Sequence, residues 1–106
     1  MLEITPIELK EYLTVADPQP LLLDVREASE YAICRIAGSR HIPMNQVPEA
    51  HESLDPEREI IVICHHGIRS RQVALFLKAR GFSNVINLSG GMDAWARHTD
   101  TSLPTY

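Results

Sequence analysis

The sequence has 106 residues, of which 44% are hydrophobic and 23% are charged, and its formal net charge is −4. This length and composition predict one globular domain over residues 1–106, with a core large enough to fold without disulfides or metal staples. The acidic charge and the absence of a basic cluster argue against nucleic-acid binding, and no apolar run is long enough to cross a membrane.

The N-terminus and the cysteines bear on the cellular compartment. Met1–Ile4 contains no basic stretch followed by an apolar one, so we predict no secretory signal. The two cysteines, Cys34 and Cys64, lie far apart in the sequence. They could pair in a secreted protein but would stay reduced in the cytoplasm, which is the location we expect.

The first half of the chain alternates apolar runs with helix signals. Thr5, Pro6 and Glu8 form a capping-box start for a helix that runs to about Leu13. The three leucines at 21–23 predict a buried strand that leads into Asp24. The other expected elements of this half are a short edge strand at 2–4, a short helix at 28–33, a brief strand within 38–43 and a helix from 48 to about 54.

The second half centres on four β-branched residues, Ile60–Ile63, which predict a strand buried on both faces. A helical pattern runs from Arg71 to Arg80, and Gly81 is placed as its C-terminal cap. The last expected elements are a strand at 85–88, a helix from 92 to about 97 with Trp95 docked on the core, and a polar tail over 98–106. Strands alternating with helices predict an α/β fold, with an open, mainly five-stranded parallel sheet and helices on both faces.

Cys64 directly follows the predicted central strand, at the end of a parallel sheet where ligands bind. The amides at the start of the next helix lack partners and favour an anion, and Gly67 permits a tightly curled loop. Such a cradle favours a reactive thiolate, so we predict that Cys64 is a nucleophile. The predicted substrate-binding residues around it are His65, His66, Gly67, Ile68, Arg69 and Ser70.

Several segments, in this order and spacing, resemble the single-domain form of the rhodanese family. They are Leu23–Arg26, Glu30–Tyr31, Gly38–Ser39, His41–Pro43, Cys64–Ser70, Gly81–Phe82, Val85, Leu88–Gly91 and Ala94–Trp95. The resemblance implies a rhodanese-like fold and sulfur transfer through a persulfide on Cys64. It also implies a small anionic sulfur donor such as thiosulfate, a thiol or protein sulfur acceptor, and no metal or organic cofactor.

One departure from the family pattern is Cys34-Arg35-Ile36, where the family commonly has Gly-His-Ile. This leaves the cradle intact and adds a second thiol, which we expect to be structural rather than resolving. We expect Asp24 and Arg26 to form a structural ion pair rather than a catalytic one. Arg69 has two open roles, either a solvated loop residue or an attractor of an anionic donor.

Four other interpretations compete with sulfur transfer. The simplest is that Cys64 is a buried structural residue, because free cysteine is often buried. A cysteine phosphatase or arsenate reductase has the pattern Cys-x5-Arg, whereas Ser70 occupies that arginine position here. A rhodanese-fold binding module without turnover is a third alternative, because fold does not determine function. A metal at Cys64, His65 and His66 is disfavoured, since adjacent residues rarely ligate one tetrahedral ion.

Overall fold

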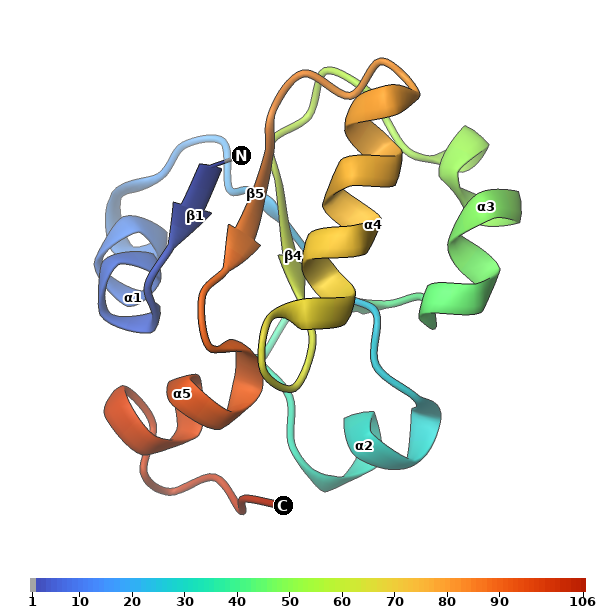
Figure 1. Ribbon diagram of the computed structural model, residues 1–106. Helices are drawn as coiled ribbons and strands as arrows, with labels where there is room; N and C mark the ends of the chain where they lie inside the picture. The colour runs from blue at the N-terminus through green and yellow to red at the C-terminus, as the bar shows by residue number, and fades with distance from the viewer. Residues whose placement is uncertain (1) are drawn as a thin grey trace.

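The computed structural model, which describes residues 2–106, is built on a five-stranded sheet with strand order β1-β5-β4-β2-β3 (Figure 1). All neighbouring strands pair in parallel. The strands are β1 (Leu2–Ile4), β2 (Leu21–Asp24), β3 (Arg40–His41), β4 (Ile60–Ile63) and β5 (Val85–Leu88). The predicted open parallel α/β fold is therefore confirmed, including β1 as a short edge strand.

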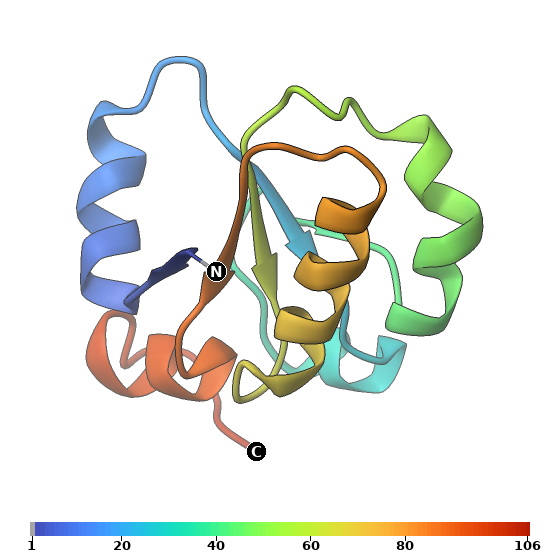
Figure 2. The same cartoon turned by 45° about the horizontal axis from the view of Figure 1, so that its top comes forward.

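Helices cover both faces of the sheet, with α1 and α5 on one side and α3 and α4 on the other (Figures 1 and 2). Their bounds are α1 (Pro6–Val15), α2 (Ala28–Ile33), α3 (Val47–Ala50), α4 (Ile68–Ala79) and α5 (Gly91–His98). Two 3₁₀ turns, η1 (Met44–Gln46) and η2 (His51–Ser53), flank α3. In residues 2–106, no helix is both long and apolar enough to cross a membrane.

The central strand β4 divides the buried residues into two cores. Its side chains alternate between the two faces, and all four are fully buried. Ile60 and Val62 pack in one core with Val73 and Leu77 of α4. The core on the other face contains Ile61, Ile63, Leu9 of α1 and, as predicted, Trp95 of α5.

The capping box predicted for α1 is confirmed. Thr5 Oγ1 accepts from the Glu8 N–H at 3.2 Å, and Glu8 Oε1 accepts from the Thr5 N–H at 2.9 Å. The helix runs two residues past the predicted end, to Val15, because Ala16 is the first residue with extended backbone. The short helix α2 has the predicted bounds.

The single helix predicted from 48 to about 54 is wrong in detail. The chain instead forms η1, α3 and η2 in succession. Side chains compete for the backbone here: His51 Nδ1 lies 2.7 Å from the Pro48 carbonyl, and the Ser53 hydroxyl donates to the Ala50 carbonyl at 2.7 Å. Such local bonds favour tight turns over a continuous α-helix.

Helix α4 begins at Ile68, three residues before the predicted start at Arg71. Gly67 is its N-cap with a φ of 98°, a left-handed value that glycine adopts without strain. The chain can therefore turn from β4 into the helix within four residues, 64–67. Ile68, Arg69 and Ser70 belong to the first helical turn rather than to a longer loop.

The segment after α5 folds back onto the body of the protein. Leu103 packs against the core that contains Trp95, and the Asp100 N–H donates to the Trp95 carbonyl at 3.0 Å. The ring of Tyr106 lies 4.1 Å from that of His65, measured between centroids. The predicted polar tail thus brings an aromatic side chain against the loop after β4, where Figure 2 shows the C-terminus.

Candidate functional site

The loop between β4 and α4 brings together three of the predicted site residues. Cys64 is buried, with 1% of its surface exposed. Its sulfur accepts from the Gly67 N–H at 3.0 Å and lies 3.3 Å from the Ser70 hydroxyl. Among residues 2–106, Gly67 supplies the one backbone amide that donates to this sulfur.

The start of α5 holds the loop from behind. The N–H of Met92 donates to the Cys64 carbonyl at 2.8 Å, and that of Asp93 donates to the His65 carbonyl at 3.0 Å. Gly91 permits this approach, because a Cβ there would lie 2.3 Å from the Cys64 oxygen. Peptide groups are planar and trans, so carbonyls drawn toward α5 leave the following N–H groups facing away from it. The start of α5 thus holds the backbone of the loop, and of the amides predicted to surround Cys64, that of Gly67 donates to its sulfur.

Asn87 of β5 joins the loop to Ser70. It is 2% exposed, and its Nδ2 donates to the Gly67 carbonyl and to Glu3 Oε1, each at 3.1 Å. Its Oδ1 accepts from the Ser70 hydroxyl. A hydroxyl has one proton, so the Ser70 oxygen faces Cys64 as an acceptor. To donate to an anionic sulfur at Cys64, the Ser70 hydroxyl would turn away from Asn87.

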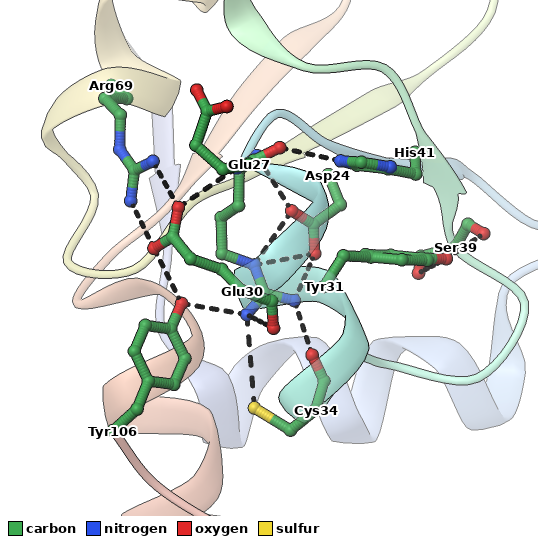
Figure 3. A network of polar contacts seen from close by, with 10 residues as sticks. Asp24, Glu27, Glu30, Tyr31, Cys34, Ser39, His41, Arg69 and Tyr106 are labelled. Carbon is green, nitrogen blue, oxygen red and sulfur yellow. Dashed lines mark hydrogen bonds and ion pairs between the residues drawn. The ribbon is translucent and has the colours of Figure 1, made fainter.

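Arg69 is paired within the protein, and its role toward an anionic donor stays a prediction. Its guanidinium donates to both oxygens of Glu30 on α2, at 2.7 and 2.8 Å (Figure 3). The Tyr106 hydroxyl donates to the same carboxylate at 3.0 Å. The hydrogen bonds from Arg69 are the main reason that the pKa of Glu30 falls to about 2, and the pKa of Arg69 rises through the same contact.

Asp24 and Arg26 form the ion pair predicted for them, and both side chains are fully buried. Arg26 Nη2 lies 2.8 Å from Asp24 Oδ2 and 2.6 Å from the Cys34 carbonyl. Its Nη1 donates to the Glu30 carbonyl and to the Tyr106 hydroxyl (Figure 3). Burial opposes the charge, but the bonds to Asp24 and Tyr106 outweigh it and raise the pKa of Arg26. The pair joins β2, α2 and the chain end.

The other predicted site residues, His65, His66 and Ile68, lie in the loop or at the start of α4 and make no hydrogen bond to the sulfur in the part of the chain that the structure describes. The His65 ring lies against that of Tyr106 at a tilt of 30° and contacts His66, and within residues 2–106 its buried Nδ1 has no hydrogen-bond partner. Burial, followed by the nearby His66, lowers the pKa of His65. His66 is exposed, with Nδ1 3.9 Å from Asp93 Oδ2. Ile68 is 71% exposed, so it contributes backbone rather than packing.

Comparison with known proteins places this geometry in a family. A sequence model of the Rhodanese-like domain matches residues 5–98. The chain belongs to the rhodanese-like domain family. A rhodanese-like domain protein from Staphylococcus aureus, solved by crystallography, matches it with a TM-score of 0.85 and 33% identity, over 100% of this chain and 99% of the other.

Two curated relatives match this rhodanese-like domain over most of their own length. The putative sulfurtransferase YtwF of Bacillus subtilis is 42% identical over 97 residues, 92% of each chain. The thiosulfate sulfurtransferase GlpE of Actinobacillus succinogenes is 35% identical over 95 residues, 90% of this chain and 84% of the relative. The chain spans only 30% of a longer chloroplast relative from Arabidopsis thaliana, Rhodanese-like/PpiC domain-containing protein 12.

The two thiols of this rhodanese-like domain lie on opposite faces of its sheet. Cys64 shares a core with Val62, whereas Cys34 packs in the core that contains Ile63. Both are free and buried, and the Cys34 sulfur lies 4.0 Å from Arg26 Nη1. This placement fits the structural role expected for Cys34.

A surface hollow of about 430 Å³ flanks the loop of the rhodanese-like domain. Its wall includes His66, Gly67, Ile68, Arg71, Leu75 and Asn87, but not Cys64. The thiol therefore lies beneath the loop rather than at the floor of this hollow. In the part of the chain that the structure describes, no three His, Cys, Asp or Glu side chains gather at a spacing that could hold a metal ion.

Sequence reasoning missed two side chains that shape this site in the rhodanese-like domain. Asn87 had a detectable signal, because it is the one polar residue in the predicted buried strand 85–88. Tyr106 had none, since it lies in a segment without periodicity. Glu30 was recognised only as part of the family pattern, and its ion pair with Arg69 spans 39 positions.

Proposed function

We propose that the chain is a sulfurtransferase that carries sulfane sulfur as a persulfide on Cys64. The observation that supports this most strongly is the position of the Cys64 sulfur, which follows β4 and accepts the Gly67 N–H at the start of α4. Helix N-termini and inward-facing amides stabilise anionic sulfur. The names of the relatives YtwF and GlpE point to the same class of reaction.

In the first half-reaction, the Cys64 sulfur attacks the outer sulfur of a donor such as thiosulfate. The S–S bond of the donor breaks, and sulfite leaves with its electron pair and takes up the Cys64 proton. Cys64 keeps the transferred sulfur as a persulfide anion. The Ser70 hydroxyl, 3.3 Å from the sulfur, can then turn from Asn87 and donate to the new anion.

In the second half-reaction, an acceptor thiolate attacks the terminal sulfur of the persulfide. The bond to Cys64 Sγ breaks, the acceptor becomes a persulfide, and Cys64 takes a proton from solvent. The donor product leaves before the acceptor reacts, so ping-pong kinetics should follow. Both half-reactions use the chain's own thiol and amides and no redox cofactor.

The burial of Cys64 bears on which molecules react. Because the residue is 1% exposed, the loop must widen locally before any donor sulfur can reach it. The thiol also lies apart from the hollow that flanks the loop. We therefore expect compact donors and acceptors to react faster than bulky ones.

Sulfur loading tests the proposal directly. Reduced protein is incubated with thiosulfate and its intact mass is measured. We expect wild type and Cys34→Ser to gain one sulfur atom and Cys64→Ser to gain none, while circular dichroism stays unchanged. The Cys34→Ser variant is the matched control, since it removes the other buried thiol.

Two outcomes would overturn the proposal. Loading that survives in Cys64→Ser would place the carrier at Cys34. Failure of wild type to load from thiosulfate, and equally from an organic persulfide, would instead favour a rhodanese-fold binding module without turnover.

A further inference from the structure

The charge of Arg69, the cation at the start of α4, is already matched inside the protein. Both of its terminal nitrogens donate to the Glu30 carboxylate, at 2.7 and 2.8 Å. This is the bidentate arrangement with which an arginine would otherwise bind an anionic ligand. The Arg69 side chain is 32% exposed and that of Glu30 18%, so the pair is partly shielded from solvent.

Glu30 is fixed by contacts on both of its oxygens. Oε1 accepts from the Glu27 N–H at 3.0 Å, as part of the cap of α2, and Oε2 accepts from the Tyr106 hydroxyl at 3.0 Å (Figure 3). The pKa of Glu30, lowered to about 2 mainly by Arg69, keeps the carboxylate charged at neutral pH. Arg69 therefore faces a permanent, positioned counter-charge.

Other basic side chains near the loop are also paired with carboxylates. Three arginines and one histidine in or beside the loop each have a carboxylate within 4.0 Å, whereas the other histidine of the loop, His65, has none among the described residues. The Cys64 sulfur itself contacts a neutral amide and a neutral hydroxyl. The pairs are Arg26 with Asp24 at 2.8 Å, Arg69 with Glu30 at 2.7 Å, His66 with Asp93 at 3.9 Å and Arg71 with Glu3 at 4.0 Å.

We propose that Glu30 determines the donor class of this site: by neutralising Arg69 it favours donors of low charge, such as small organic persulfides, over the thiosulfate dianion. The inference rests on the proposed sulfur transfer and specifies its substrate. A dianion brought to this loop meets amide dipoles but no uncompensated cation among the described residues, so little Coulomb attraction offsets its lost hydration.

A persulfide donor satisfies the same chemistry. The Cys64 sulfur attacks the outer sulfur of R–S–S⁻, and the S–S bond of the donor breaks. The leaving thiolate takes the Cys64 proton and departs as R–SH, while Cys64 keeps the outer sulfur as its own persulfide anion. The leaving group carries one charge fewer than sulfite, so it needs no dedicated cation.

The test compares two donors across a double-mutant cycle. Rates of Cys64 persulfide formation are measured by intact mass with thiosulfate and with 2-hydroxyethyl persulfide. The proteins are wild type, Glu30→Gln, Arg69→Gln and the double variant. Glutamine keeps an oxygen that can accept from the Glu27 N–H but removes the charge. Glu27→Gln is the matched control, because Glu27 is an exposed carboxylate at the N-cap of the same helix, and the described contacts of Arg69 are with Glu30 instead.

We expect Glu30→Gln to raise the second-order rate constant with thiosulfate about tenfold, with a smaller gain at high salt, because it frees one cation at the site. The persulfide rate should change less than about twofold. The double variant should return to the wild-type thiosulfate rate, and Glu27→Gln should leave both rates unchanged.

An unchanged or lower thiosulfate rate in folded Glu30→Gln would overturn the inference. So would an equal gain with both donors, or a gain that persists in the double variant. These results leave sulfur transfer itself intact, since wild type would still load. Absence of loading in wild type with both donors would overturn the proposed function and the inference with it.

Discussion

At the scale of single residues, the hydrogen bonds around the Cys64 sulfur depend on two side chains outside β4 and the loop that follows it, Ser70 of α4 and Asn87 of β5. The sulfur contacts Ser70, and the proton of that hydroxyl is directed by Asn87 from the neighbouring strand. The position of Cys64 could be predicted because it follows four buried β-branched residues. The direction of the Ser70 proton could not, because it depends on which atoms of Asn87 face the Gly67 carbonyl.

Replacing Asn87 tests this arrangement. Asn87→Leu has a similar volume but leaves the Gly67 carbonyl and the Ser70 hydroxyl without their buried partner. We expect the free energy of unfolding to fall by about 1–3 kcal/mol, the cost of unpaired buried polar groups. Urea denaturation measures this.

The control for Asn87→Leu is Glu3→Gln. It keeps an oxygen that can accept from Asn87 Nδ2 and should change the stability by less than about 0.5 kcal/mol. A stability for Asn87→Leu equal to that of wild type would show that Asn87 does not hold the loop.

At the scale of elements, the geometry of the loop depends on α5 as well as on α4. The first amides of α5 donate to the carbonyls of Cys64 and His65. A helix N-terminus has unpaired N–H groups, and here the loop satisfies them. The backbone of the loop is therefore held by two helix starts. A glycine in the left-handed region precedes α4, Gly67 with a φ of 98°, and another begins α5, Gly91 with a φ of 60°.

Alanine substitutions at two glycines distinguish the cost of a strained backbone from the cost of a steric clash. Gly38 and Gly91 both have positive φ, but a Cβ at Gly38 would meet nothing within 4 Å, whereas one at Gly91 would lie 2.3 Å from the Cys64 oxygen. Gly38→Ala should cost about 1–2 kcal/mol from backbone strain alone.

Gly91→Ala should cost at least ~1 kcal/mol more than Gly38→Ala, because α5 must move off the loop, and it should also slow sulfur loading. Thermal or urea unfolding and the intact-mass assay measure both effects. Equal costs for the two alanine variants would contradict the close-approach explanation.

At the scale of the whole molecule, one polar network joins segments that are distant in sequence. Glu30 of α2, Arg69 of α4 and Tyr106 near the chain end meet at one carboxylate (Figure 3). Burial is the main reason that the pKa of Tyr106 rises to about 12, so its hydroxyl keeps the proton that it donates to Glu30. The network connects the loop to the end of the chain.

The network predicts how stability depends on pH. The pKa of Glu30 is about 2 in the folded protein, against an ordinary value of 4.5. A lowered pKa means that the unfolded chain binds more protons between these values, so the contribution of Glu30 is complete above about pH 4.5 and declines as the pH falls toward 2. Urea denaturation of wild type and Glu30→Gln over this range measures it.

The difference in unfolding free energy between the two proteins should be constant from pH 7 to about 5 and should shrink below that. Other carboxylates titrate in both proteins and cancel in the difference. A difference that stays constant down to pH 3 would show that Glu30 is not held charged by Arg69.

The sequence alone determined the parallel α/β fold, the alternation of buried residues in β4 and the place of Cys64 after it. These features depend on local periodicity, capping and burial, which neighbouring residues encode. The bounds of α2 and the cap of α1 were predictable for the same reason.

Only the tertiary structure decided the start of α4, the partner of Arg69 and the return of Tyr106 to the loop. The start of α4 depends on the left-handed backbone of Gly67, whose carbonyl is held by Asn87 of β5. The other two features depend on contacts between segments that lie far apart along the chain, such as Glu30 with Arg69 or Arg26 with Tyr106. Hydrogen bonds and ion pairs at such separations have no periodic signature, because they are selected by packing of the whole sheet and its helices. The charge around Cys64 is therefore a property of the fold rather than of the loop sequence.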